Sequence, residues 1–251
     1  MIMSPFTPIF FPSAKVDGTE SRYVQTFSTD DTILVEILGM PSETLDFTLY
    51  SEPAHAKVTL SAPEAHTLNA SLKLYVYKLK LAEGCYSVTF EGRKSAVFAV
   101  SADESLSDST VLLQYSPADN RTRADVVATV NNTRLFFSFR IPGGFKDGGW
   151  SFSVDNEQFV CQDSDIVELY GRESTQKTLT IGGSEGVPVW FGQMVNRILT
   201  CRYVYIDGLR YARSQSSVPE KDQVADGVNS FVFSQKVQQV NYLDPKIEDV
   251  L

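Results

Sequence analysis

Side chains capable of acid–base or nucleophilic chemistry are few in this sequence. It contains two histidines, His55 and His66, both near segments rich in turn-forming residues. A Ser-His-Asp triad would have to use one of them, and we expect none; two histidines also exclude a three-histidine zinc site. The glycine-rich stretch 181–186 precedes a helical pattern but lacks the lysine of a phosphate-binding loop. We therefore predict no catalytic residues and a protein that is not an enzyme.

Carboxylates gather in the second half of the chain, at Asp155, Glu157, Asp163, Asp165 and Glu168. Loop acids at alternate positions supply the oxygen ligands that calcium prefers. Their spacing does not match an EF-hand loop, and acids on an acidic protein are usually solvated. We predict a solvated acidic loop, with a calcium site as the alternative, and no cofactor.

The three cysteines, Cys85, Cys161 and Cys201, are an odd set at wide spacing. Free cysteines commonly behave as small buried apolar residues, and this is the interpretation we favour. A Cys161–Cys201 disulfide remains the alternative.

Two aromatic residues lie beside glycines and are candidates for stacking against a sugar. Phe145 follows Gly143-Gly144, and Trp150 follows Gly148-Gly149. If 143–150 and 155–165 are loops at the end of a β-sandwich, they form a candidate glycan-binding site.

The elements that would position these residues are short β-strands. Runs of β-branched and aromatic residues, such as 32–38, 74–79, 86–90 and 135–139, alternate with turn residues about every ten positions. This rhythm predicts an all-β protein of two immunoglobulin-like β-sandwich modules, at 22–103 and 110–235. The polar stretch 101–109 is the expected boundary between them. Apolar residues at three- and four-residue steps predict one short helix at about 187–200.

The chain ends differ from the two modules. Residues 1–21 are expected to form an extended arm, because prolines in its first twelve residues exclude a helix or a central strand. This arm docks either on its own sandwich or on a neighbouring subunit. Residues 236–251 are expected to be a loosely held tail. The candidate interface residues of the arm are its large apolar ones: Phe6, Ile9, Phe10 and Phe11.

Composition narrows the possible partners. The formal net charge is −9, and no block of Lys or Arg offsets it. Nucleic acids and anionic membrane surfaces are therefore disfavoured as partners. The first residues lack a basic region and an uninterrupted apolar stretch, so we expect no signal peptide. No segment approaches the length of about 18 apolar residues that a membrane helix needs.

A series of turn and packing motifs resembles a known group of proteins. These motifs are EGCY (83–86), LQYS (113–116), FRIPGGF (139–145), LTIGG (179–183), GVPVW (186–190), NRILTC (196–201), VYIDGLRY (204–211) and VPEK (218–221). In this order they resemble structural proteins encoded near tail genes in phages and prophages of Bacteroides-type gut bacteria. The resemblance covers about two thirds of the chain and transfers no catalytic residue. It implies β-sandwich modules that assemble with copies of themselves or with other virion proteins.

Two functions follow as hypotheses. The first is a non-enzymatic structural or adaptor protein of a phage or prophage tail, at the baseplate or tail tip, located in the virion or in the bacterial cytoplasm during assembly. It would act through protein–protein contacts. The alternative is a carbohydrate-binding or adhesin module with a glycan as its partner.

Overall fold

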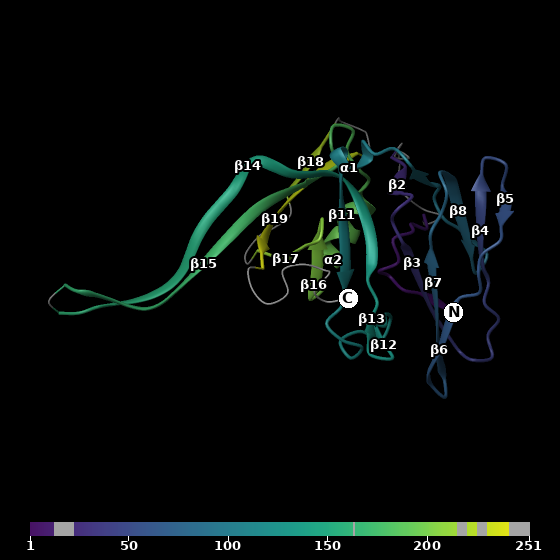
Figure 1. Ribbon diagram of the computed structural model, residues 1–251, viewed down its shortest axis with the longest axis horizontal. Helices are drawn as coiled ribbons and strands as arrows, with labels where there is room; N and C mark the ends of the chain where they lie inside the picture. Colours follow the sequence, from purple (N-terminus) through teal and green to yellow (C-terminus); the bar gives the residue numbers. More distant parts are fainter. Residues whose placement is uncertain (13–22, 163, 215–219, 225–229, 241–251) are drawn as a thin grey trace.

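The computed structural model describes residues 1–12, 23–162, 164–214, 220–224 and 230–240, and most of them lie in β-strands (Figure 1). The predicted all-β class is confirmed. The first half contains β1 (Ile2–Met3), β2 (Gln25–Ser28), β3 (Ile33–Gly39), β4 (Phe47–Glu52), β5 (Ala56–Val58), β6 (Glu64–Asn69), β7 (Leu72–Leu79), β8 (Gly84–Phe90), β9 (Arg93–Lys94) and β10 (Phe98–Ser101). The second half contains α1 (Leu106–Ser109), β11 (Thr110–Ser116), β12 (Thr129–Val130), β13 (Thr133–Arg134), β14 (Phe137–Val160), β15 (Ile166–Ile181), α2 (Val189–Ile198), β16 (Tyr203–Ile206), β17 (Leu209–Arg213), β18 (Glu220–Gln223) and β19 (Phe231–Gln239).

The strands of the first half form two sheets that share one apolar core. One sheet has the order β1-β3-β7-β6, and the other has the order β2-β10-β8-β4-β5, with β9 on β8. Alternate side chains of both sheets meet in this core, among them Val35, Leu49, Val88 and Phe98. Two layers around one core are what the sequence rhythm predicted for this half, and its immunoglobulin-like character stays a prediction.

The main sheet of the second half closes on itself. Its order is β15-β14-β11-β16-β17-β19-β18, and β15 also pairs with β19 through Gln176–Ile181. Six strands thus form a ring, whose apolar core includes Leu113, Phe139 and Leu179. This pairing differs from the separate layers expected of a sandwich. The reason is that the inner part of β15 pairs with β14 along one edge and with β19 along the other, which closes the sheet. β14 and β15 are also each one long strand where the sequence predicted several short ones.

Helix α2 packs on this ring close to where it was predicted. It spans Val189–Ile198, begins after Pro188, and buries Phe191, Met194, Val195 and Ile198. The chain then turns at Asp207-Gly208 between β16 and β17. Both turn residues have positive φ, at 48° and 79°, which is the two-residue hairpin geometry that an Asp-Gly pair favours.

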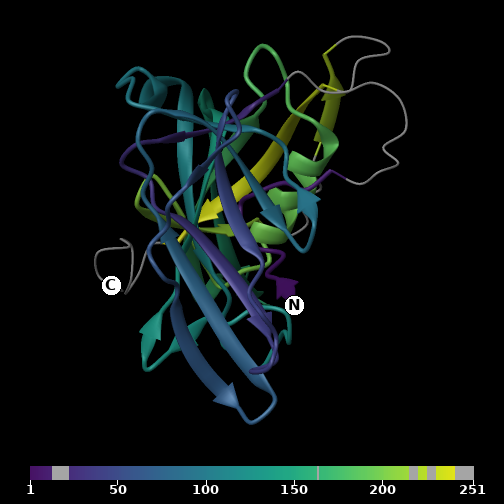
Figure 2. The same cartoon turned by 90° about the vertical axis from the view of Figure 1, so that its right-hand side faces the viewer.

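The two halves are joined by a continuous apolar core. All seven residues of β3 are buried, because one face of β3 contacts the first-half core and the other face contacts the second half. In Figure 2 the first-half sheets lie in front of the second half. The predicted linker at 101–109 contains α1, and β11 follows it directly. Of the predicted tail, residues 236–239 belong to β19, with Val237 fully buried, and 241–251 lie outside the described residues.

A buried ion pair also links the two halves, at what we call the junction. The Arg140 guanidinium donates from Nε to Asp31 Oδ2 at 2.7 Å and from Nη2 to Asp31 Oδ1 at 2.8 Å. Gln25 Nε2 donates to the carbonyl oxygen of Arg140 at 2.9 Å. The Asp31 carboxylate raises the pKa of Arg140. Bidentate geometry of this kind fixes the relative position of the two halves.

Candidate functional site

The feature that distinguishes this molecule is a long hairpin that leaves the ring. The inner parts of β14 and β15 belong to the ring, and their outer parts pair with each other from Trp150 with Lys177 to Val160 with Ile166. At the start of this outer part, Gln176 and Lys177 of β15 also pair with β19. Figure 1 shows this ribbon projecting far from the body. At about 3.4 Å per residue, the paired outer part of β14 is about 35 Å long. We call residues 150–177 the projecting hairpin.

One face of the projecting hairpin carries an apolar row. Residues directly opposite each other in an antiparallel pair share a face, and alternate residues along a strand do too. Trp150, Phe152 and Val154 therefore point to the same side. Their side chains are exposed, Phe152 to 77%, and the rings of Trp150 and Phe152 stack with centroids 6.2 Å apart.

The tip of the hairpin is apolar on both faces. Phe159 pairs with Val167 on one face, and Val160 pairs with Ile166 on the other. Leu169 lies at the register shift next to the tip, and Tyr170 follows it. Together with the apolar row, these make nine large apolar side chains that are 44% to 77% exposed. An exposed apolar surface of this size indicates an interaction site.

The face opposite the apolar row is polar. Ser151 lies across from Gln176, and Ser153 lies across from Ser174. The hydroxyl oxygens of Ser153 and Ser174 are 2.6 Å apart. Along this stretch β14 therefore has one apolar face and one polar face. This alternation is typical of a strand that packs one face against another layer.

Lys177 holds the base of the hairpin against the body. Its Nζ lies 3.8 Å from the ring centroid of Trp150 and 4.9 Å from that of Phe145. The same Nζ donates to the hydroxyl of Tyr211 on β17 at 3.1 Å. Cation–π contacts of this kind favour one orientation of the hairpin at its base.

The prediction of a ligand loop around Phe145 and Trp150 is wrong about the backbone, which is a strand there. The structure brings both side chains together around Lys177, but residues 143–150 are part of strand β14 and do not form a loop. Phe145 is half-buried and packs at 5.2 Å against the ring of Tyr211. The glycines instead accompany a bulge, since the register of β14 shifts between Phe145 and Trp150.

The predicted interface residues of the N-terminal arm are used within the chain. Phe6 is 1% exposed and packs against the stacked rings of Tyr115 and Phe137, and Ile9 is buried in the first-half core. Phe10 stacks on Trp190 of α2, with centroids 4.2 Å apart. The guanidinium of Arg93 lies over the ring of half-buried Phe11. Of the two docking alternatives, the described arm follows the intramolecular one, and residues 13–21 lie outside the described residues.

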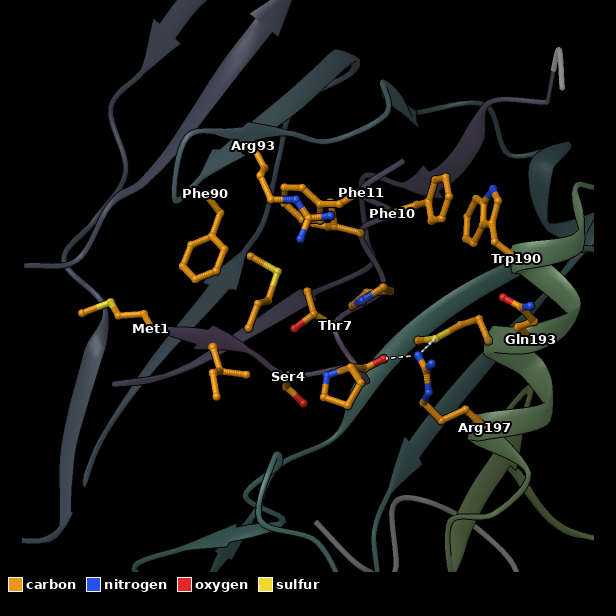
Figure 3. A pocket seen from close by; sticks show the side chains of 16 residues that line it. Met1, Ser4, Thr7, Phe10, Phe11, Phe90, Arg93, Trp190, Gln193 and Arg197 are labelled. Carbon is orange, nitrogen blue, oxygen red and sulfur yellow. Dashed lines mark hydrogen bonds between the residues drawn. The ribbon is translucent and has the colours of Figure 1, made fainter. Parts of the chain in front are cut away.

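A cavity of about 420 Å³ lies beside the arm (Figure 3). Its wall combines residues of the arm with Phe90 and Arg93 from the first half and with residues of α2. Arg197 of α2 donates from Nη1 to the carbonyl oxygen of Pro5 at 2.7 Å. No carboxylate, histidine or cysteine lines the described wall of the cavity, and its hydroxyl groups are those of Ser4 and Thr7.

The most perturbed carboxyl group is buried at the junction of the two halves and the arm. Glu36 on β3 is fully buried, and its Oε1 accepts from the backbone N–H of Val127 at 2.6 Å. Burial raises the pKa of Glu36 to about 8, against the lowering effect of the Val127 and Ser4 hydrogen bonds. The arm also contacts this residue, because Ser4 N–H donates to the backbone carbonyl of Glu36 at 2.8 Å.

The structure places most of the predicted loop acids on strands and leaves the three cysteines unpaired. Asp155 and Glu157 lie on β14 and Glu168 on β15, while Asp163 lies outside the described residues. The described residues contain no group of three side chains placed to hold a metal ion. All three cysteines are free; Cys85 is exposed, whereas burial raises the pKa of Cys201 to about 12, which disfavours its thiolate form.

Comparisons of this chain with protein families, curated proteins and solved structures found no match. Within the described ranges, neither helix has the length and apolar character needed to cross a membrane. The projecting hairpin is therefore identified as the candidate site from its geometry and exposure alone. Sequence reasoning missed this site, although one signal was present: the alternation Trp150-x-Phe152-x-Val154 with serines between.

Proposed function

We propose that this protein is a non-enzymatic structural or adaptor protein of a phage or prophage tail, which assembles through its projecting hairpin. The observation that carries the proposal is the set of nine exposed apolar side chains on a ribbon outside the body. The tail setting, in the virion or in the bacterial cytoplasm during assembly, comes from the motif resemblance. Its partners would be copies of itself or other virion proteins.

Stability considerations support an assembly role. A two-stranded ribbon is marginally stable in water unless a further layer covers it. Among the described residues, such support for the projecting hairpin comes only at its base, through Lys177 and the ring strands. The rigid junction around Arg140 and Asp31 would then present the hairpin at a fixed angle to a partner.

The glycan alternative has weaker support. A sugar-stacking platform needs an open aromatic face, and the Nζ of Lys177 lies 3.8 Å from the ring centroid of Trp150. Phe145, the second aromatic residue of that hypothesis, packs on Tyr211. We therefore place protein–protein contact first.

Co-expression with the products of the neighbouring genes tests the proposal. We expect the full chain to co-purify with one of them, and the Phe152→Ser/Val154→Ser variant to lose this association. The matched control is Ser151→Ala/Ser153→Ala, on the opposite face of the same strand, which should retain it. If both variants associate like the native protein, the hairpin is not the assembly surface.

A further inference from the structure

We propose that the outer edge of β14 pairs with the same edge of a second copy of this chain, antiparallel, around a two-fold axis at Ser153. This inference rests on the proposed function, because it names one partner of the same hairpin. It would join two projecting hairpins into one four-stranded sheet.

The first step is that this edge is open. Among the described residues, the neighbours of β14 are β15 and β11, and the pairing with β11 ends at Pro142. From Trp150 to Glu157 the outer side of β14 therefore has no strand beside it within the described part of the chain. The segment contains neither proline nor lysine, the residues that commonly protect an exposed edge from pairing.

β14 also offers a longer open edge than β15. Each residue from Trp150 to Glu157 pairs in unbroken register with β15. On β15 the open stretch in this register is shorter, from Tyr170 to Thr175, because Gln176–Ile181 is already paired with β19 and the register shifts beside Leu169. A bulge disrupts the ladder that a new strand would need, so strand addition is favoured at β14.

A two-fold axis at Ser153 would bring compatible side chains opposite each other. Phe152 of each copy would lie opposite Val154 of the other, on the same face, and aromatic with β-branched pairs stabilise antiparallel strands. The two apolar rows would merge into one surface. Ser151 would lie opposite Asp155, and Glu157 opposite Gly149, so no carboxylate meets another.

Charge favours the antiparallel arrangement over a parallel one. The formal charge of the projecting hairpin is negative, with its acids, such as Glu157, Asp165 and Glu168, toward the tip. A parallel pairing would place these acidic ends side by side. The two-fold pairing places each acidic end next to the neutral Gly149–Ser151 stretch of the other copy, and the tips point in opposite directions.

Cysteine cross-linking of the full chain tests the register directly. In a background with Cys85, Cys161 and Cys201 replaced by alanine, Ser153→Cys places two thiols opposite each other. Directly opposed residues have Cα atoms about 4.5 to 5.5 Å apart, within the range that a disulfide spans. The control is Ser174→Cys on β15, one strand further from the axis. The Ser174 positions of the two copies would be about three strand spacings apart, roughly 14 Å, which is too far for a disulfide.

We expect disulfide-linked dimers from Ser153→Cys and none from Ser174→Cys on mild oxidation. Light scattering of the unmodified protein should show a monomer–dimer equilibrium that Val154→Lys shifts to monomer. A protein that stays monomeric at every concentration overturns the proposal and leaves another protein as the occupant of the edge. Dimers that cross-link equally well at Ser174 overturn the register.

These outcomes are separable from failure of the proposed function. A monomeric chain that still co-purifies with a neighbouring gene product through Phe152 and Val154 refutes only the second copy as partner. If neither self-association nor co-purification depends on the hairpin, both proposals fail.

Discussion

The Glu36→Gln substitution should remove a large pH dependence of stability. In the unfolded chain a glutamate titrates near its ordinary pKa of about 4.3 to 4.5, whereas burial raises the pKa of Glu36 to about 8 in the folded protein. Between these values the folded state holds a proton that the unfolded state has released. Unfolding therefore becomes easier as the pH rises through this window, and the stabilising effect is lost by about pH 8.

The two pKa values give the size of the effect. Linkage predicts that native stability falls by about 3 to 4 kcal/mol between pH 5 and pH 8, a large part of the total for a typical domain. In Glu36→Gln the amide oxygen can still accept from Val127 N–H, and no proton is exchanged. The stability of the variant relative to the native protein should therefore rise by about 3 to 4 kcal/mol from pH 5 to pH 8.

Urea unfolding followed by tryptophan fluorescence and circular dichroism at pH 5, 6, 7 and 8 measures this slope. The control is Glu64→Gln, because Glu64 is exposed and the ammonium of Lys78 lowers its pKa, so it titrates below this window. The control should keep the native slope. A native protein whose unfolding free energy does not change between pH 5 and 8, or a Glu36→Gln variant with the native slope, refutes the reasoning.

Three further predictions concern the junction, the arm and the hairpin. Arg140→Ala leaves Asp31 buried without its cation and should cost about 3 to 5 kcal/mol in urea unfolding, against less than about 1 kcal/mol for the exposed Lys78→Ala. Phe6→Ala should lower the unfolding free energy by about 3 kcal/mol or more, since Phe6 is buried between the halves; a loss below about 1 kcal/mol would contradict its role in joining them. Phe152→Ser should leave the unfolding free energy within about 0.5 kcal/mol and reduce the fluorescence of a bound apolar dye; a marked loss of stability would show that Phe152 is packed.

The sequence predicted the elements that local chemistry determines. The all-β class follows from strands whose alternate residues, such as Val35 and Ile37, face one core. The Asp207-Gly208 hairpin and the helix after Pro188 follow from backbone preferences at those positions. These features depend on neighbours along the chain, so a single sequence contains the information for them.

Features set by long-range pairing could not be derived in this way. Closure of the ring depends on β15 meeting β19, and nothing local to Gln176–Ile181 specifies that partner. The sequence does not choose between the two docking sites of the arm, because Phe6 and Ile9 are apolar whichever surface covers them. Only the positions of Tyr115 and Phe137 show that the surface for Phe6 belongs to the same chain.

The projecting hairpin shows why an apolar alternation does not determine its own environment. Trp150, Phe152 and Val154 repeat every second residue, as in any strand with one buried face, and such a pattern does not distinguish burial by the same chain from burial by another. Among the described residues nothing covers this row, because its side chains lie on a ribbon outside both cores. An apolar row that the described residues leave exposed is the observation on which the proposed contact with another molecule depends.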